Sequence, residues 1–170
     1  SAYCDLLKDG DIALGDEVDI CVPTGNFGNI LGAYIGKLMG MPFHSFVCAS
    51  NKNNVLTDFF VRGVYDRNRD FYATTSPSMD ILISSNLERL LYLLCGQAET
   101  ERLMAKLKET GRYSISEDVK EALKGTFYGY YCDEEMTAEQ IKSTYEDYDY
   151  LIDTHTAVGI SCAMQYLKEN

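Results

Sequence analysis

The hydrophobic pattern in the first part of the chain alternates between short apolar runs and runs with helical spacing. Residues 17–22 are largely apolar and partly β-branched, which predicts a buried strand. Apolar positions then recur at helical spacing from Asn29 until Gly40, so a helix is expected there. A second strand at 43–49 and a second helix that ends at Gly63 repeat the unit. This alternation predicts an α/β fold with a mainly parallel sheet and helices on both faces.

The second part of the chain is richer in polar and helical stretches. Residues 63–78 are polar and predict a long loop, with Ser78 as the cap of an amphipathic helix that ends at Gly96. The pattern then predicts helices at 97–108 and 116–124, a strand at 126–132 and a helix capped by Thr137. The first seven residues resemble the last turns of a helix and lack an initiator methionine, so an excised fragment is expected.

Composition and charge narrow the class of protein. The chain has 170 residues, of which 46% are hydrophobic, enough for one folded domain. A formal charge of -11 opposes binding to nucleic acid or to anionic lipid, and no stretch is apolar enough to cross a membrane. The six cysteines are scattered and form no CxxC pair, so free thiols in a reducing, cytoplasmic compartment are expected. With two histidines and no paired cysteines, no metal site is expected.

The turn from Thr24 to Asn29 is the strongest candidate for a binding site. It joins the carboxyl end of the first predicted strand to the start of a helix, where open α/β sheets bind ligands. Its glycines and asparagines suit a tight backbone whose N–H groups converge on one anion. The turn matches neither a Walker loop nor a dinucleotide-binding fingerprint. By spacing alone, a phosphate or carboxylate site and a plain structural turn are equal alternatives.

Several linked motifs carry a resemblance to a known family. Residues 22–31, VPTGNFGNIL, closely resemble the phosphate-loop segment of threonine synthases. The motifs KLMGMP at 37–42, ASNKNNVL at 49–56 with the pair FF at 59–60, and SPSMDI with SSNLERL at 76–90 follow in that family's order and spacing. Near the other end, DTHTAVG at 153–159 resembles the segment in which a threonine approaches the cofactor's pyridine nitrogen. The resemblance is weakest at 97–150, which we interpret as a helical, tyrosine-rich insertion.

The resemblance implies a fold, a cofactor and a set of binding residues. The fold would be the tryptophan-synthase-β-like fold type II of pyridoxal-phosphate enzymes, with residues 1–170 forming a single α/β domain that is most of the large cofactor-binding domain. The turn would hold the phosphate of pyridoxal 5'-phosphate through its backbone, and a threonine hydroxyl would meet the ring nitrogen. The residues so assigned are Gly25, Asn26, Phe27, Gly28, Asn29 and Thr156. The alternative for Thr156 is that it caps the last helix.

The resemblance also implies an activity that this chain would not perform alone. Threonine synthase converts O-phospho-L-homoserine and water to L-threonine and phosphate. The family's Schiff-base lysine lies in a Phe-Lys-Asp motif upstream of the phosphate loop, and that motif is absent here. We therefore expect no catalytic residue in this chain, and we expect the lysine to lie in a missing N-terminal half of the same protein. An apolar face left uncovered by that half would favour self-association.

Several other residues could carry chemistry, and two other classes of function are alternatives. Lys37 is expected on a solvated helix face, His44 in a hydrogen bond, and Cys21 in the strand core, none of them catalytic. Asn53 or Asn54 is expected to cap the following helix. The alternative functions are another fold type II lyase, such as a serine or threonine dehydratase or a cysteine synthase, and a non-catalytic anion-binding module.

Overall fold

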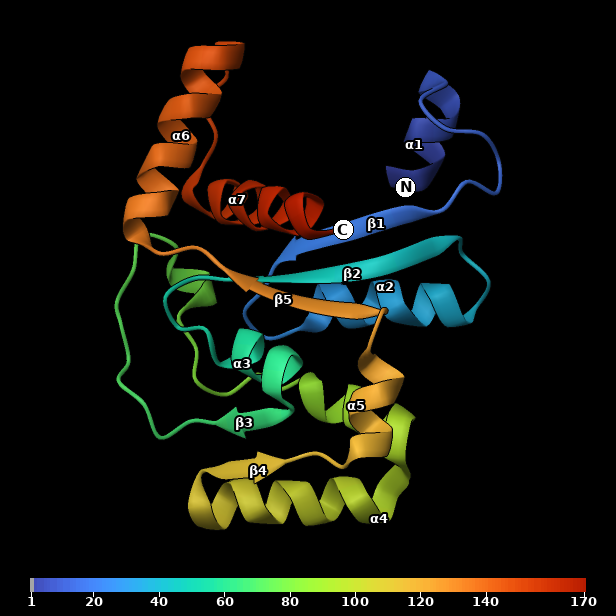
Figure 1. The fold of residues 1–170 in the computed structure, drawn as a ribbon, viewed down its shortest axis with the longest axis vertical. Coiled ribbons are helices and arrows are strands. Elements are labelled where there is room, and N and C mark those ends of the chain that lie inside the picture. Colours follow the sequence, from blue (N-terminus) through green and yellow to red (C-terminus); the bar gives the residue numbers. More distant parts are fainter. Residues whose placement is uncertain (1) are drawn as a thin grey trace.

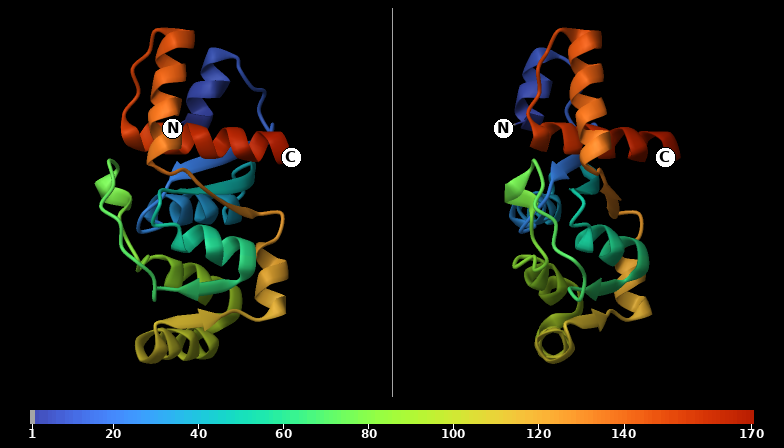
Figure 2. Two further views of the ribbon diagram at one scale, coloured as in Figure 1. Left: turned by 60° about the vertical axis from the view of Figure 1, so that its left-hand side comes forward. Right: turned by 90° about the vertical axis from the view of Figure 1, so that its left-hand side faces the viewer.

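A computed structural model describes residues 2–170 and shows a three-stranded parallel sheet between two layers of helices (Figure 1). The strands are β1 (Val18–Pro23), β2 (Phe43–Ser50) and β5 (Phe127–Tyr131), in the order β1-β2-β5. Helices α2 (Gly28–Leu38) and α3 (Val55–Arg62) lie on one side of the sheet, and α7 (Thr154–Glu169) lies on the other (Figures 1 and 2). The predicted α/β class, with a parallel sheet and helices on both faces, is confirmed.

The sheet divides the buried apolar side chains into two clusters. The larger cluster lies on the α2 and α3 side and contains the aromatic rings of Phe27, Phe46, Phe59 and Phe127. The smaller one lies under α7 and includes Val158. The side chains of β2 are buried from Ser45 to Ser50, as expected for a central strand covered on both faces. This arrangement places the carboxyl ends of all three strands at one edge of the sheet.

A second, smaller layer packs beyond α3 and was only partly predicted. It comprises β3 (Val64–Asp66), α4 (Leu87–Thr110), β4 (Arg112–Ser114) and α5 (Glu117–Leu123). The expected loop at 63–78 is therefore wrong at its start, because β3 pairs antiparallel with β4. The rings of Tyr65 and Tyr113 stack there, with centroids 5.2 Å apart and planes 3° apart. Each strand has only three residues, too short for a visible alternation of apolar and polar positions.

The helix boundaries in this region correct two predicted caps. Ser78 does not cap the amphipathic helix, because it lies in a short 3-10 helix, η1 (Pro77–Met79), and α4 begins only at Leu87. Gly96 does interrupt α4 as predicted, since its backbone is non-helical there, with φ 75° and ψ 179°. The helix after β5, α6 (Glu134–Tyr148), is capped by Asp133 and not by Thr137.

The N-terminal helix and the helix that precedes α7 lie on the same side of the sheet as α7. Helix α1 (Ala2–Asp9) and helix α6 extend beyond α7, away from the sheet (Figures 1 and 2). No helix in residues 2–170 has the length and the apolar content needed to span a membrane. The cysteines are free thiols: Cys48, Cys132 and Cys162 are buried, Cys21 and Cys95 are partly buried, and Cys4 is exposed.

A candidate phosphate-binding site at the end of the first strand

The turn between β1 and α2 is fixed at both of its ends. At its start, the N–H of Thr24 donates to the carbonyl of Ala49 on β2 over 2.8 Å, and the Thr24 hydroxyl donates to the carbonyl of Val22 over 2.6 Å. At its end, Phe27 has a left-handed backbone, with φ 62° and ψ 10°. Its side chain is 1% exposed and stacks on Phe60 with ring centroids 5.6 Å apart. The ring of Phe27 therefore anchors the turn in the core, and only its backbone faces the site.

The hydrogen bonds of this turn use its carbonyl groups. The carbonyl of Gly25 accepts from the Ser84 hydroxyl over 3.0 Å, and that of Asn26 accepts from the side-chain amide of Asn86 over 2.8 Å. By contrast, the six backbone N–H groups from Gly25 to Ile30 have no acceptor within residues 2–170. A cavity of about 220 Å³ is lined by residues 22–30. Successive unpaired N–H groups at a helix start form an anion site.

A second segment packs against the turn. A Cβ atom on Gly25 would lie 2.6 Å from the carbonyl oxygen of Ser78 in η1, so only glycine fits beside that backbone. The Ser78 hydroxyl in turn lies 2.6 Å from Nε2 of His155 in the first turn of α7. Helix α7 also touches the end of β1, because a Cβ atom on Gly159 would be 2.8 Å from Cγ of Pro23. The turn, η1 and the start of α7 thus meet at one edge of the sheet.

Thr156 lies in this first turn of α7, and its side chain is exposed. The alternative that Thr156 caps the helix is wrong, because Asp153 is the cap and its carboxylate accepts from the Thr156 N–H over 2.7 Å. That backbone hydrogen bond is the main cause that holds the pKa of Asp153 below its ordinary value. The structure therefore brings the predicted threonine to the same edge as the predicted turn.

A buried polar cluster holds the segment that leads into η1. The carboxylate of Asp80 accepts from Asn51 Nδ2 over 2.7 Å, from Asn53 Nδ2 over 3.0 Å, and from the hydroxyl and N–H of Thr74 over 2.7 and 2.9 Å. Partial burial acts to raise the pKa of Asp80, but these hydrogen bonds outweigh it and the pKa lies below its ordinary value. Asn51 and Asn53 thus bind Asp80. The expected cap of α3 is confirmed in its position, since Asn54 is the N-cap residue, but its side chain makes no capping hydrogen bond. The asparagines lie in the motif ASNKNNVL, whose local pattern does not reveal the cluster.

The remaining candidate side chains lie away from this edge of the sheet or form hydrogen bonds with other groups. The Lys37 ammonium donates to the carbonyls of Phe43 and His44, at the start of β2 and so at the opposite edge of the sheet. Nδ1 of His44 lies 2.9 Å from Asp19, as expected of a hydrogen-bonded histidine. The Cys21 thiol donates to the carbonyl of Gly159 over 3.2 Å, and burial raises its pKa to about 11. None of the three is placed for chemistry at the turn.

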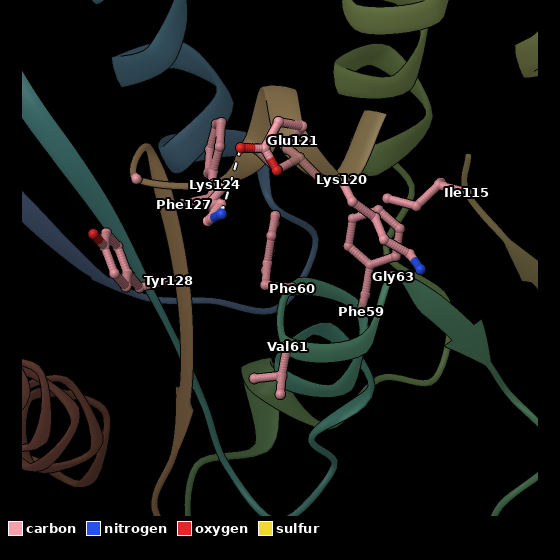
Figure 3. Close-up of a pocket in the computed structure, with 12 residues that line it drawn as sticks. Phe59, Phe60, Val61, Gly63, Ile115, Lys120, Glu121, Lys124, Phe127 and Tyr128 are labelled. Atoms are coloured by element: carbon pink, nitrogen blue, oxygen red, sulfur yellow. Dashed lines mark hydrogen bonds and ion pairs between the residues drawn. The ribbon is translucent and has the colours of Figure 1, made fainter. Parts of the chain in front are cut away.

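A second cavity, of about 260 Å³, lies at that opposite edge between α3, α5 and the start of β5 (Figure 3). Phe60 points into it, and the ammonium of Lys124 lies 3.4 Å from Glu121 (Figure 3). Lys120 is likewise paired with Glu117 over 2.6 Å. Each lysine has an acidic partner that offsets its charge. This cavity is therefore a weaker candidate for an anion-binding site than the turn.

Comparison with known proteins gives a consistent result across sequence and structure. No family model matches the chain. It is 48% identical over 163 residues to human threonine synthase-like 1, covering 94% of this chain and 22% of that protein. It is 39% identical over 171 residues to threonine synthase of Saccharomyces cerevisiae, covering 91% of this chain and 33% of that protein.

Solved structures extend the similarity to the fold. The crystal structure of threonine synthase from Brucella melitensis with bound pyridoxal phosphate matches with a TM-score of 0.89 and 38% identity, over 96% of this chain and 35% of that one. The yeast threonine synthase structure matches with a TM-score of 0.88 and 34% identity. This chain thus spans about a third or less of the length of these relatives. The expected type II fold of pyridoxal-phosphate enzymes is confirmed, and the chain is homologous in sequence and structure to one segment of the threonine synthases.

Proposed function

We propose that this chain forms the phosphate-binding part of the pyridoxal-phosphate site of a threonine synthase, as most of its large domain. The observation that carries the proposal is the run of six backbone N–H groups from Gly25 to Ile30, at the start of α2, that have no acceptor among the described residues 2–170. The homologous Brucella enzyme binds pyridoxal phosphate, and the parent reaction would convert O-phospho-L-homoserine and water to L-threonine and phosphate. Threonine biosynthesis in the cytoplasm is the corresponding cellular role.

The residues present fit the phosphate of this cofactor. The chain carries a formal charge of -11, so an anion must be held by local dipoles rather than by the overall field. Backbone N–H groups at a helix start provide such dipoles, and Gly25 lets the backbone of η1 close beside them. Gly28 and Asn29 leave the opening uncovered, since both side-chain positions are exposed. When bound, the cofactor supplies an electron-withdrawing ring that stabilises negative charge on the substrate.

Thr156 would orient the ring end of the cofactor. A hydroxyl beside the ring nitrogen can form a hydrogen bond with it without placing a full negative charge there. Its exposure on the first turn of α7 leaves it accessible from the same edge as the turn. We propose that Gly25, Asn26, Phe27, Gly28 and Asn29 hold the phosphate through the backbone while Thr156 meets the ring.

The covalent chemistry would come from outside the residues described. Lys37, the lysine that follows the turn by one helix, is bonded at the far edge of the sheet. We therefore propose that the Schiff-base lysine belongs to another part of the parent protein and that this chain alone is inactive. Exposed apolar side chains on α7, among them Leu167, support a further proposal that the isolated chain self-associates. Light scattering that shows only monomer would contradict that last point.

A titration followed by NMR tests the assignment of the turn. Pyridoxine 5'-phosphate is the probe, because it has the ring and the phosphate but no aldehyde that reacts with surface lysines. We expect it to shift the amide resonances of residues 25–30, and pyridoxine without phosphate to leave them unchanged. Gly25→Ala should abolish the shifts, because the added Cβ meets the Ser78 carbonyl at 2.6 Å.

Gly32→Ala is the matched control for that variant. Gly32 lies in α2, and a Cβ atom there meets nothing within 4 Å. Its amide shifts should match those of the unaltered chain. Equal binding by Gly25→Ala and Gly32→Ala would contradict the site. Binding of inorganic phosphate with no added affinity for the ring would favour the non-catalytic anion-binding alternative.

A further inference from the structure

The segment from Tyr72 to Asp80 connects the two places that the proposed cofactor would contact. The backbone carbonyl of Ser78 lies beside Gly25 of the turn. The side chain of Ser78 contacts His155, the neighbour of Thr156. The same residue therefore contacts the phosphate turn through its backbone and α7 through its hydroxyl.

The segment is held rigidly at both sides of Ser78. Asp80 anchors it to the end of β2 through its bonds to Asn51 and Asn53. Thr75 is bonded twice, because its N–H donates to Glu134 over 3.0 Å and its carbonyl accepts from the Thr154 hydroxyl over 2.8 Å. The loop after β2 and the first residues of α6 and α7 thus hold this segment. The bond between Ser78 and His155 joins this anchored segment to the helix that carries Thr156.

Ser78 and His155 link the residue beside Gly25 directly to the neighbour of Thr156. Both residues have solvent-accessible side chains, so the contact between them removes little surface from solvent. It joins the first turn of α7 to the segment that packs against the phosphate turn. A ligand bound at two points gains affinity only when the two binding groups are held at a separation that matches the ligand.

We propose, on the basis of the function proposed above, that Ser78 and His155 are a positioning pair that sets the distance between the phosphate turn and Thr156. Neither residue takes part in bond making. The pair acts through Thr156 on the ring end of the ligand and leaves the phosphate end unaffected. A ligand with a ring and a phosphate should sense the pair, and inorganic phosphate should not.

A double-mutant cycle with two probes tests this pair. Ser78→Ala, His155→Ala and the double variant are titrated with pyridoxine 5'-phosphate and with inorganic phosphate, following the amides of residues 25–30. Each single variant should weaken pyridoxine 5'-phosphate by about 3- to 10-fold, as expected for one hydrogen bond, and the double variant should lose no more than a single one. Affinity for inorganic phosphate should be unchanged in all three.

The controls separate positioning from a general loss of structure. Ser78→Thr keeps the hydroxyl and should restore affinity. Ser143→Ala on α6 and His44→Ala at the opposite edge should have no effect, as their partners are elsewhere. Equal losses for both probes would show a damaged turn and overturn the pair, as would additive losses or no loss. If the unaltered chain binds neither probe, the proposed function and the pair fail together; normal binding with unaffected variants refutes the pair alone.

Discussion

Phe27 combines a buried aromatic ring with a left-handed backbone, and these two features have opposite energetic consequences. Its ring is 1% exposed and contacts Phe60 and Phe127. Truncating such a side chain costs about 3–5 kcal/mol of the free energy of unfolding. An L-residue in the left-handed region costs about 1–2 kcal/mol, which glycine avoids. Glycine also gives the unfolded chain more entropy, which costs about 0.5–1 kcal/mol.

These terms predict an unusual order of stability. Phe27→Ala should lose about 4 kcal/mol of the free energy of unfolding, since it forfeits the ring and keeps the strained backbone. Phe27→Gly should lose about 3 kcal/mol, because relief of the strain exceeds the added entropy of the unfolded chain. Glycine should therefore be the better replacement at this position. Urea unfolding followed by far-UV circular dichroism measures both variants.

An exposed helical position provides the control for this order. Ala105 is exposed within α4. Ala105→Gly should lower the free energy of unfolding by about 1 kcal/mol, the usual order of the two residues in a helix. If Phe27→Gly is less stable than Phe27→Ala by a similar amount, the turn does not impose the left-handed conformation and the reasoning is refuted.

Two further predictions concern ionisable side chains. Asp80→Asn should lower the free energy of unfolding by about 2–3 kcal/mol at neutral pH, since Thr74 loses its acceptor, while Asp147→Asn on the surface should change little. Because the pKa of Asp80 is lowered on folding, its contribution is complete above the ordinary value of 3.8 and is lost at lower pH, so the urea midpoints should converge in acid. A thiol reagent at neutral pH should label exposed Cys4 and not Cys48, whose pKa burial raises to about 12; rapid labelling of both would contradict the buried core.

The main elements were predictable because their patterns are local. The apolar runs at β1 and β2, the spacing along α2 and the interruption at Gly96 each follow from residues close in sequence. The sequence predicts a tight or left-handed backbone in this turn and favours its glycines and asparagines as the residues that adopt it. The structure assigns that conformation to Phe27, because the ring is needed in the core.

The parts that sequence reasoning missed depend on distant partners. Strand β3 exists because β4 lies beside it, and the two are separated by the whole of α4. The cluster around Asp80 joins Asn51 and Thr74 through bonds that no local pattern reveals. Ser78 and His155 are 77 positions apart, and each belongs to a separate motif. Periodicity reports which side chains face the interior, and it does not report which polar groups meet there.

The strand order β1-β2-β5 has a consequence for how the chain folds. One edge of β2 pairs with β1 early in the sequence, but its other edge waits for β5, after residues 51–126 have been made. Closing so long a segment is slow compared with forming local helices. Until then, the strand FHSFVCAS exposes unpaired backbone and aromatic side chains. A nascent or truncated chain that stops before Phe127 is therefore the species most prone to aggregation, and a chaperone that covers the free edge of β2 would protect it.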